Sequence, residues 1–160
     1  MKRFFLLLLV SLCLVGCGKQ VDPAMTYYQN AVTDVSERTS FDTEFPFQIR
    51  VGVEPLDSQE FIYQVVVDQV SSKLTEVRAI AVADDPIDDT YPSVGIFDDP
   101  ITLVPSKLTD SDKKGFYLVG YLSRKKDAAD YTGRIKVYIE YRDEQGTLYK
   151  KYYCYQKETK

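Results

Sequence analysis

The sequence contains no histidine and no tryptophan. Histidine is the usual general base near neutral pH and a common zinc ligand, so its absence excludes Ser-His-Asp and Cys-His catalysis and His-ligated zinc. The chain also lacks a glycine-rich phosphate-binding loop. We therefore expect that the protein is not an enzyme. The one catalytic mechanism that the composition leaves open is that of glycosidases, which use a pair of carboxylates.

Cysteine and clustered basic charge are scarce as well. Two of the three cysteines fall within the first seventeen residues, so Cys154 is the one thiol in the body of the chain. Cys154 lies in a tyrosine-rich run, which favours a buried inert thiol over a nucleophile. Acidic side chains outnumber basic ones by 24 to 20, and the strongest basic cluster is residues 124–126. This balance argues against nucleic acid as a partner.

The N-terminus has a positive start followed by a short apolar run. Lys2 and Arg3 precede apolar and small residues that continue from Phe4 to Val15, the pattern of a secretory signal. A helix that spans a bilayer needs about 20 apolar residues. The run is therefore too short for a stable transmembrane anchor, and we expect it to be removed.

The apolar run ends in Leu14, Val15, Gly16 and Cys17. These residues resemble the lipobox of bacterial lipoproteins, in which a small residue precedes an invariant cysteine. The resemblance implies that residues 1–16 are a signal peptide, that cleavage falls between Gly16 and Cys17, and that the Cys17 thiol carries diacylglycerol. Two acyl chains give stable attachment, so the mature chain is expected in the cell membrane on the extracytoplasmic side. The alternative is an ordinary signal peptide with an incidental cysteine.

Residues 17–40 are expected to form the lipidated N-terminus and a tether. Asp22 can cap a helix whose first residue is Pro23. The apolar residues that follow at helical spacing are Met25, Tyr28, Val32 and Val35. Two interpretations stay open, a short amphipathic helix that ends near Arg38 and a flexible linker.

Residues 41–157 show the pattern of strands. The run FPFQIRVGV alternates in polarity, as a half-buried strand does. Further β-rich runs are EFIYQVVVDQV, LTEVRAIAVA, GFYLVGYL, GRIKVYIEYR and TLYKKYYCYQ. No helical stretch separates them, which predicts an all-β fold made of a single antiparallel β-sandwich. The outline resembles the immunoglobulin-like or fibronectin type III-like modules of bacterial surface proteins, without the Cys…Trp…Cys pattern of true immunoglobulin domains.

The last two runs predict a hairpin with a defined register. Residues 144–146 form a three-residue loop whose glycine takes the left-handed conformation. Glu140 then faces Lys150, and Tyr138 faces Tyr152. Cross-strand pairs of opposite charge and of aromatic rings favour this register over one that is shifted by a residue.

The chain has thirteen tyrosines. Four of them are expected on a sheet face among charged neighbours, namely Tyr117, Tyr121, Tyr138 and Tyr152. Such a face suits the recognition of a protein or a glycan, and Tyr138 and Tyr152 are the candidate partner-binding residues. In the alternative interpretation these rings form cross-strand pairs or fill the core.

The middle of the chain repeats the tetrapeptide Asp-Asp-Pro-Ile. Its carboxylates are candidate calcium ligands, namely Asp84, Asp85, Asp88, Asp89, Asp98 and Asp99. Calcium is bound by oxygen atoms, but the spacing does not match an EF-hand loop. The alternative is turn chemistry, because an aspartate can bond to the backbone that follows it.

These observations predict a membrane-anchored extracytoplasmic lipoprotein that acts as a non-catalytic binding or accessory module in the cell envelope. Its partners are the lipid bilayer, through the diacylglycerol on Cys17, and an envelope protein or glycan. The alternative is a surface protein that binds calcium or another ligand through the Asp-rich loops. No cofactor is expected apart from that calcium.

Overall fold

The structure is a computed structural model that describes residues 21–106, 113–124 and 129–157. Its elements are the helix α2 (Pro23–Glu37) and the strands β1 (Gln48–Pro55), β2 (Glu60–Asp68), β3 (Leu74–Ala83), β4 (Ser93–Val94), β5 (Ile101–Leu103), β6 (Phe116–Ser123), β7 (Arg134–Arg142) and β8 (Leu148–Gln156). The chain is therefore mostly β, as the sequence predicts.

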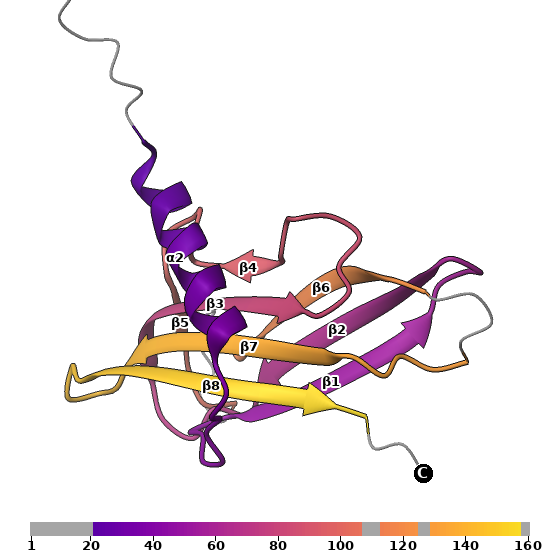
Figure 1. Ribbon diagram of the computed structural model, residues 1–160. Helices are drawn as coiled ribbons and strands as arrows, with labels where there is room; N and C mark the ends of the chain where they lie inside the picture. The colour runs from indigo at the N-terminus through magenta and orange to yellow at the C-terminus, as the bar shows by residue number, and fades with distance from the viewer. Residues whose placement is uncertain (1–20, 107–112, 125–128, 158–160) are drawn as a thin grey trace, which may run out of the picture.

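The strands form two antiparallel sheets. The smaller sheet has the order β1-β2-β6, and the larger has the order β4-β3-β7-β8 with β5 paired to β3. Figure 1 shows the strands of the two sheets as separate layers, and the inner faces of both layers contribute to one hydrophobic cluster. This architecture confirms the expected all-β sandwich at the level of its layers.

The main core lies between the sheets and follows from strand alternation. Every second residue of β2 from Phe61 to Val67 is buried, and Ile135, Val137 and Ile139 of β7 meet this face from the other sheet. Each large apolar side chain buried in this way contributes about 1.5–3 kcal/mol of transfer free energy. No disulfide is present among the described residues, so apolar burial is the main source of stability.

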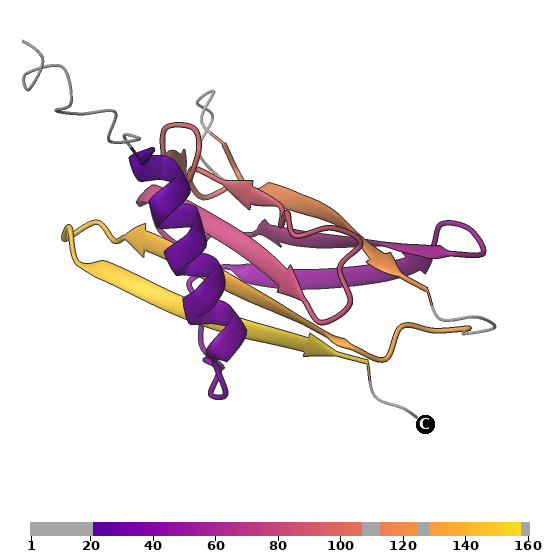
Figure 2. The same ribbon diagram turned by 45° about the horizontal axis from the view of Figure 1, so that its top comes forward.

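Helix α2 packs on the outer face of the larger sheet, where it crosses the strands β3, β7 and β8 (Figure 2). The Asp22 carboxylate accepts a hydrogen bond from the N–H of Ala24 at 2.9 Å, Pro23 is at the start, and Arg38 is the C-cap. Of the two interpretations that the sequence leaves open, the helix is thus correct for these residues and the flexible linker is wrong. No helix in the described ranges is long and apolar enough to cross a membrane.

The β7–β8 hairpin has the predicted register. Glu140 pairs with Lys150, and Tyr138 pairs with Tyr152. Gly146 has a φ of +80°. The hairpin register was predictable because the loop and the cross-strand pairs are local in sequence.

Candidate functional site

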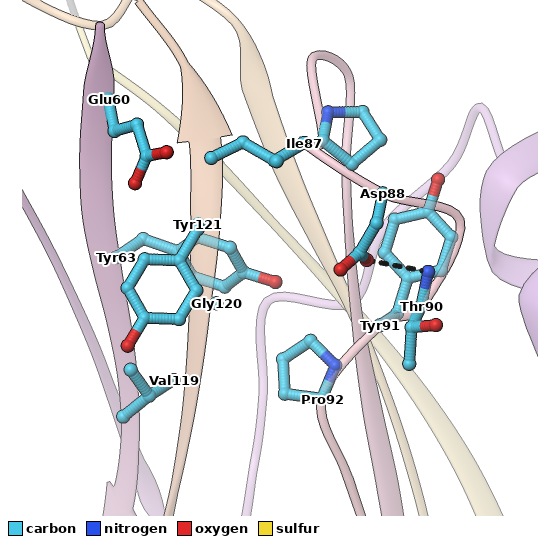
Figure 3. Close-up of a pocket in the computed structure, with 11 residues that line it drawn as sticks. Glu60, Tyr63, Ile87, Asp88, Thr90, Tyr91, Pro92, Val119, Gly120 and Tyr121 are labelled. Atoms are coloured by element: carbon cyan, nitrogen blue, oxygen red, sulfur yellow. Dashed lines mark hydrogen bonds between the residues drawn. The ribbon is translucent and has the colours of Figure 1, made fainter.

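A groove lies at one edge of the sandwich, where β6 meets the loop between β3 and β4 (Figure 3). Its volume is about 380 Å³. We call it the β6 groove. Strands β2 and β6 supply Glu60, Tyr63, Val119, Gly120 and Tyr121, and the loop supplies Pro86, Ile87, Asp88, Thr90, Tyr91 and Pro92.

The floor of the groove depends on a glycine in the middle of β6. Gly120 is paired with Tyr63 of β2, and a Cβ atom at position 120 would lie 2.4 Å from the Tyr63 ring. A glycine inside a strand often marks such a close approach. The Tyr63 ring is 2% exposed and lies against the backbone of Gly120. A larger residue at position 120 would displace this ring.

The outer wall of the groove is tied to β6 by the backbone. The N–H of Ser123 donates to the carbonyl of Asp85 at 2.9 Å, and the N–H of Ile87 donates to the carbonyl of Tyr121 at 3.4 Å. These bonds hold the start of the loop beside one end of the strand. Figure 3 shows the Ile87 side chain extending from the loop toward Glu60.

The far part of the loop is held by its own turn and by helix α2. The Asp88 carboxylate accepts from the N–H of Thr90 at 2.8 Å (Figure 3). The N–H of Tyr91 donates to the hydroxyl of Tyr28 on the helix at 2.5 Å. The groove wall is therefore preorganised by contacts to both the sheet and the helix, which reduces the entropy that a ligand must overcome.

The groove combines exposed apolar groups with negative charge. Tyr121 is 50% exposed and Ile87 is 44% exposed. Glu60 and Asp88 are its acidic side chains, and no lysine or arginine occurs among the described residues that line it. The Tyr91 hydroxyl is protonated at neutral pH, as an ordinary tyrosine is, and burial raises its pKa further, so this group can donate a hydrogen bond. The site can therefore accept an apolar surface together with a cationic group.

The two candidate partner-binding tyrosines lie elsewhere. Tyr138 and Tyr152 are 2% and 8% exposed, because helix α2 covers the sheet face that carries them. Their rings form a cross-strand pair with centroids 5.5 Å apart. The expectation of an exposed face at these rings is therefore wrong. Tyr117 and Tyr121 are exposed as expected, but they lie on the other sheet.

A polar network fills the interface between the helix and the larger sheet. The Tyr138 hydroxyl donates to the Glu140 carboxylate at 2.8 Å, and Arg78 forms an ion pair with the same carboxylate at 3.0 Å. Burial opposes ionisation of Glu140, but the hydrogen bonds from Tyr138, Tyr27 and Arg78 outweigh it and lower its pKa. Glu140 is 5% exposed, so its charge serves the docking of the helix and not an open site.

The six candidate calcium ligands do not converge. In the part of the chain that the structure describes, no three acidic or cysteine side chains are placed to hold a metal ion. Asp84 accepts hydrogen bonds from the backbone and side chain of Arg134 at 3.0 and 3.2 Å, and Asp88 closes its turn with Thr90. Asp98 and Asp99 are exposed in the loop before β5. These contacts favour the turn interpretation over a calcium site.

The residues of the predicted lipid anchor, Gly16 and Cys17, lie outside the described residues. Cys154 is half-buried on β8, and burial raises the pKa of its thiol. The thiol is therefore protonated at neutral pH, as expected of an inert cysteine.

The sequence does not predict the β6 groove, because its walls come from segments about sixty and thirty residues apart. One signal was present. Gly120 interrupts the β-rich run GFYLVGYL, and a glycine inside a strand indicates close approach of another group. That signal marks a place on β6, but the loop that completes the groove is known only from the fold.

No protein-family model matches this chain, and neither the curated proteins nor the solved structures contain one that is significantly similar to it.

Proposed function

We propose that this protein is a membrane-anchored extracytoplasmic lipoprotein whose sandwich binds a partner in the cell envelope without catalysis. The anchor is supported by the signal-like N-terminus that ends at Gly16 and Cys17. The binding role is supported by the β6 groove, which is the one observation that carries it. Its preformed walls and exposed Tyr121 are typical of recognition surfaces.

The strand order supports an immunoglobulin-like or fibronectin type III-like module. In such modules the strands A, B and E share one sheet, and the strands C, F and G share the other, with C′ added beside C. The smaller sheet has the order β1-β2-β6, and the larger has β4 beside β3, then β7 and β8. This order corresponds to A-B-E and C′-C-F-G. Modules of this class commonly serve in recognition, although a fold by itself does not define a function.

The docked helix leaves little chain between the domain and the proposed anchor. The helix begins at Pro23, so residues 17–22 connect the anchor to the body of the protein. At about 3.4 Å per extended residue they reach at most about 20 Å. The proposed partner is therefore a molecule found close to the membrane surface.

The anchor is tested by replacing Cys17 and following the protein in a bacterial host. We expect the parent chain to incorporate labelled fatty acid and to partition into detergent, and the Cys17→Ser variant to lose both properties. The matched control is Cys13→Ser, which changes a cysteine of the same apolar run and should keep both. A Cys17→Ser product of mature size that still partitions into detergent would contradict the lipoprotein.

The binding role is tested with a photo-crosslinking amino acid in place of Tyr121 in intact cells. We expect one recurrent envelope component to be captured from this position. The control position is Tyr149, which is also exposed at 39% but lies on β8 outside the groove. Equal capture from both positions, or none from position 121, would contradict a binding site in the β6 groove.

A further inference from the structure

The edge of β6 beside the groove is open over part of its length. In an antiparallel strand, alternate residues direct their backbone N–H and C=O groups to opposite sides. Tyr121 and Ser123 direct theirs to the loop between β3 and β4, as their hydrogen bonds to Ile87 and Asp85 show. Residues 117 and 119 have the same parity, so their backbone groups point to this side as well.

The loop does not continue along the strand to these two residues. Within the ranges that the structure describes, no backbone hydrogen bond outside the ladder with β2 involves Tyr117 or Val119. Their N–H and C=O groups are therefore available at the edge of the smaller sheet. An open edge of this kind is a template for another extended segment.

The composition of β6 differs from that of the other long edge strands. Charged side chains and proline usually protect exposed edges. Strand β1 has Arg50, Glu54 and Pro55, and β8 has Lys150 and Lys151. Strand β6, with the sequence FYLVGYLS, has no charged residue and no proline. Its edge therefore lacks the protection that the other two edges have.

The charge of the groove selects among possible occupants. Glu60 and Asp88 stand in its lining, and the described lining has no basic side chain. Strand β6 itself has no lysine or arginine, and a second copy would bring only the residues that flank the strand, Lys113, Lys114 and Arg124. A partner segment with basic side chains has the opposite charge to both carboxylates, and a cation in the groove can also contact the exposed ring of Tyr121.

We propose that the β6 groove binds an extended, basic peptide segment of a partner protein, which adds as a strand to the open edge of β6 at residues 117–119 and directs its lysine or arginine side chains toward the acidic lining formed by Glu60 and Asp88. The inference rests on the proposed binding function and names the chemistry of its partner. Backbone hydrogen bonds to Val119 supply affinity, and the groove supplies specificity for the basic side chain.

The test measures fluorescence anisotropy of two dye-labelled peptides with the full chain purified in a non-ionic detergent. The probes are Thr-Val-Lys-Val-Lys-Val-Thr and the same peptide with glutamate in place of each lysine. We expect saturable binding of the lysine peptide, at least tenfold tighter than that of the glutamate peptide and weakened by salt. Equal binding of the two peptides, or no binding of the lysine peptide, would overturn the proposal.

Charge variants locate the site. A double variant, Glu60→Gln with Asp88→Asn, removes both negative charges of the groove. The amide oxygen of the new side chain at position 88 can still accept the hydrogen bond from the N–H of Thr90. We expect at least a fivefold loss of affinity for the lysine peptide. The matched control is Glu54→Gln on β1, which lies outside the groove and should change affinity less than twofold. Equal losses in the double variant and the control would overturn the assignment to this groove.

A backbone variant tests strand addition. Val119→Pro removes the outward N–H, which the ladder with β2 does not use, and we expect binding of the lysine peptide to be abolished. Val119→Thr keeps the N–H and should bind normally. Undiminished binding by a folded Val119→Pro chain overturns strand addition. Analytical ultracentrifugation tests a second copy as the occupant. If the parent chain sediments as a dimer and Val119→Pro makes it a monomer, the edge of β6 binds a second copy of the chain, and the peptide proposal is overturned.

The two proposals fail separately. Capture of an envelope component at position 121 together with no preference for the lysine peptide overturns only the basic-peptide proposal. Loss of both signals overturns the binding function as well.

Discussion

At the scale of single residues, the glycine–tyrosine contact between β6 and β2 is the feature on which the groove depends. Gly120 has no side chain, and the ring of Tyr63 occupies the space that a Cβ would need. The ring is buried and belongs to the main hydrophobic core. The same contact therefore forms the floor of the groove and closes the core beneath it.

We expect Gly120→Ala to lower the free energy of unfolding by about 1–3 kcal/mol, because the added methyl group overpacks the site. The measurement is urea unfolding followed by far-UV circular dichroism. Gly52→Ala on β1 is the matched control, since a Cβ there meets no atom within 4 Å. The control should be neutral or stabilising by up to about 1 kcal/mol. Equal destabilisation by both variants would show that the Tyr63 contact is unimportant.

The buried carboxylate of Glu140 predicts a pH dependence. Its pKa is lowered in the folded state, so the unfolded state binds the proton more readily. The stabilisation is fully present above the unfolded pKa, about 4.3, and is lost as the pH falls through the lower folded value. We expect the parent protein to lose more unfolding free energy between pH 7 and pH 3 than Glu140→Gln does. Parallel stability curves for the two proteins would contradict this account.

At the scale of the elements, helix α2 covers the larger sheet and supports the groove. Tyr28, Ala31 and Val35 are its buried residues, and Tyr28 also holds the backbone of Tyr91 in the groove wall. Lys136 of β7 donates hydrogen bonds to carbonyls at the end of the helix, those of Ser36 and Arg38. Cations near a helix C-terminus interact favourably with the helix dipole. The helix is thus held by both apolar packing and polar contacts.

We expect Ala31→Glu to displace the helix, because it places a carboxylate against the sheet at a position where Ala31 is only 6% exposed. Displacement should expose Tyr138 and Tyr152, and the measurement is the quenching of tyrosine fluorescence by acrylamide. The control is Asn30→Glu, which makes the neighbouring exposed position acidic and should leave quenching unchanged. Unchanged quenching in Ala31→Glu would contradict the packing of the helix on these rings.

At the scale of the whole molecule, the two sheets differ in how their outer faces are covered. The larger sheet is covered by helix α2, whereas the smaller sheet exposes Tyr117 and Tyr121. The β6 groove lies where the edge of this open sheet meets the loop from the covered one. The molecule therefore presents one protected face and one face suited to contact with a partner.

Much of the local structure could be predicted from the sequence. The β-rich runs and the β7–β8 register follow from periodicity and cross-strand pairing, which act over short distances along the chain. The capping pattern at Pro23 indicates a helix but leaves a flexible linker open, and the structure shows the helix. The predicted pairing of the hairpin tyrosines is correct. The prediction that their face is open to solvent is wrong, because sequence periodicity shows which residues share a face but not what covers it.

The sequence by itself determined the all-β class, the strand segments and the hairpin, since each depends on neighbours in the chain. It indicated the capped helix only as one of two open interpretations. Only the tertiary structure decided that helix α2 covers Tyr138 and Tyr152, and that Glu60, Asp88 and Tyr121 line one groove. These features depend on contacts between residues that are far apart in sequence. Such contacts form only when the sheets, the helix and the loop pack together, and the local pattern of residues in the sequence does not predict that packing.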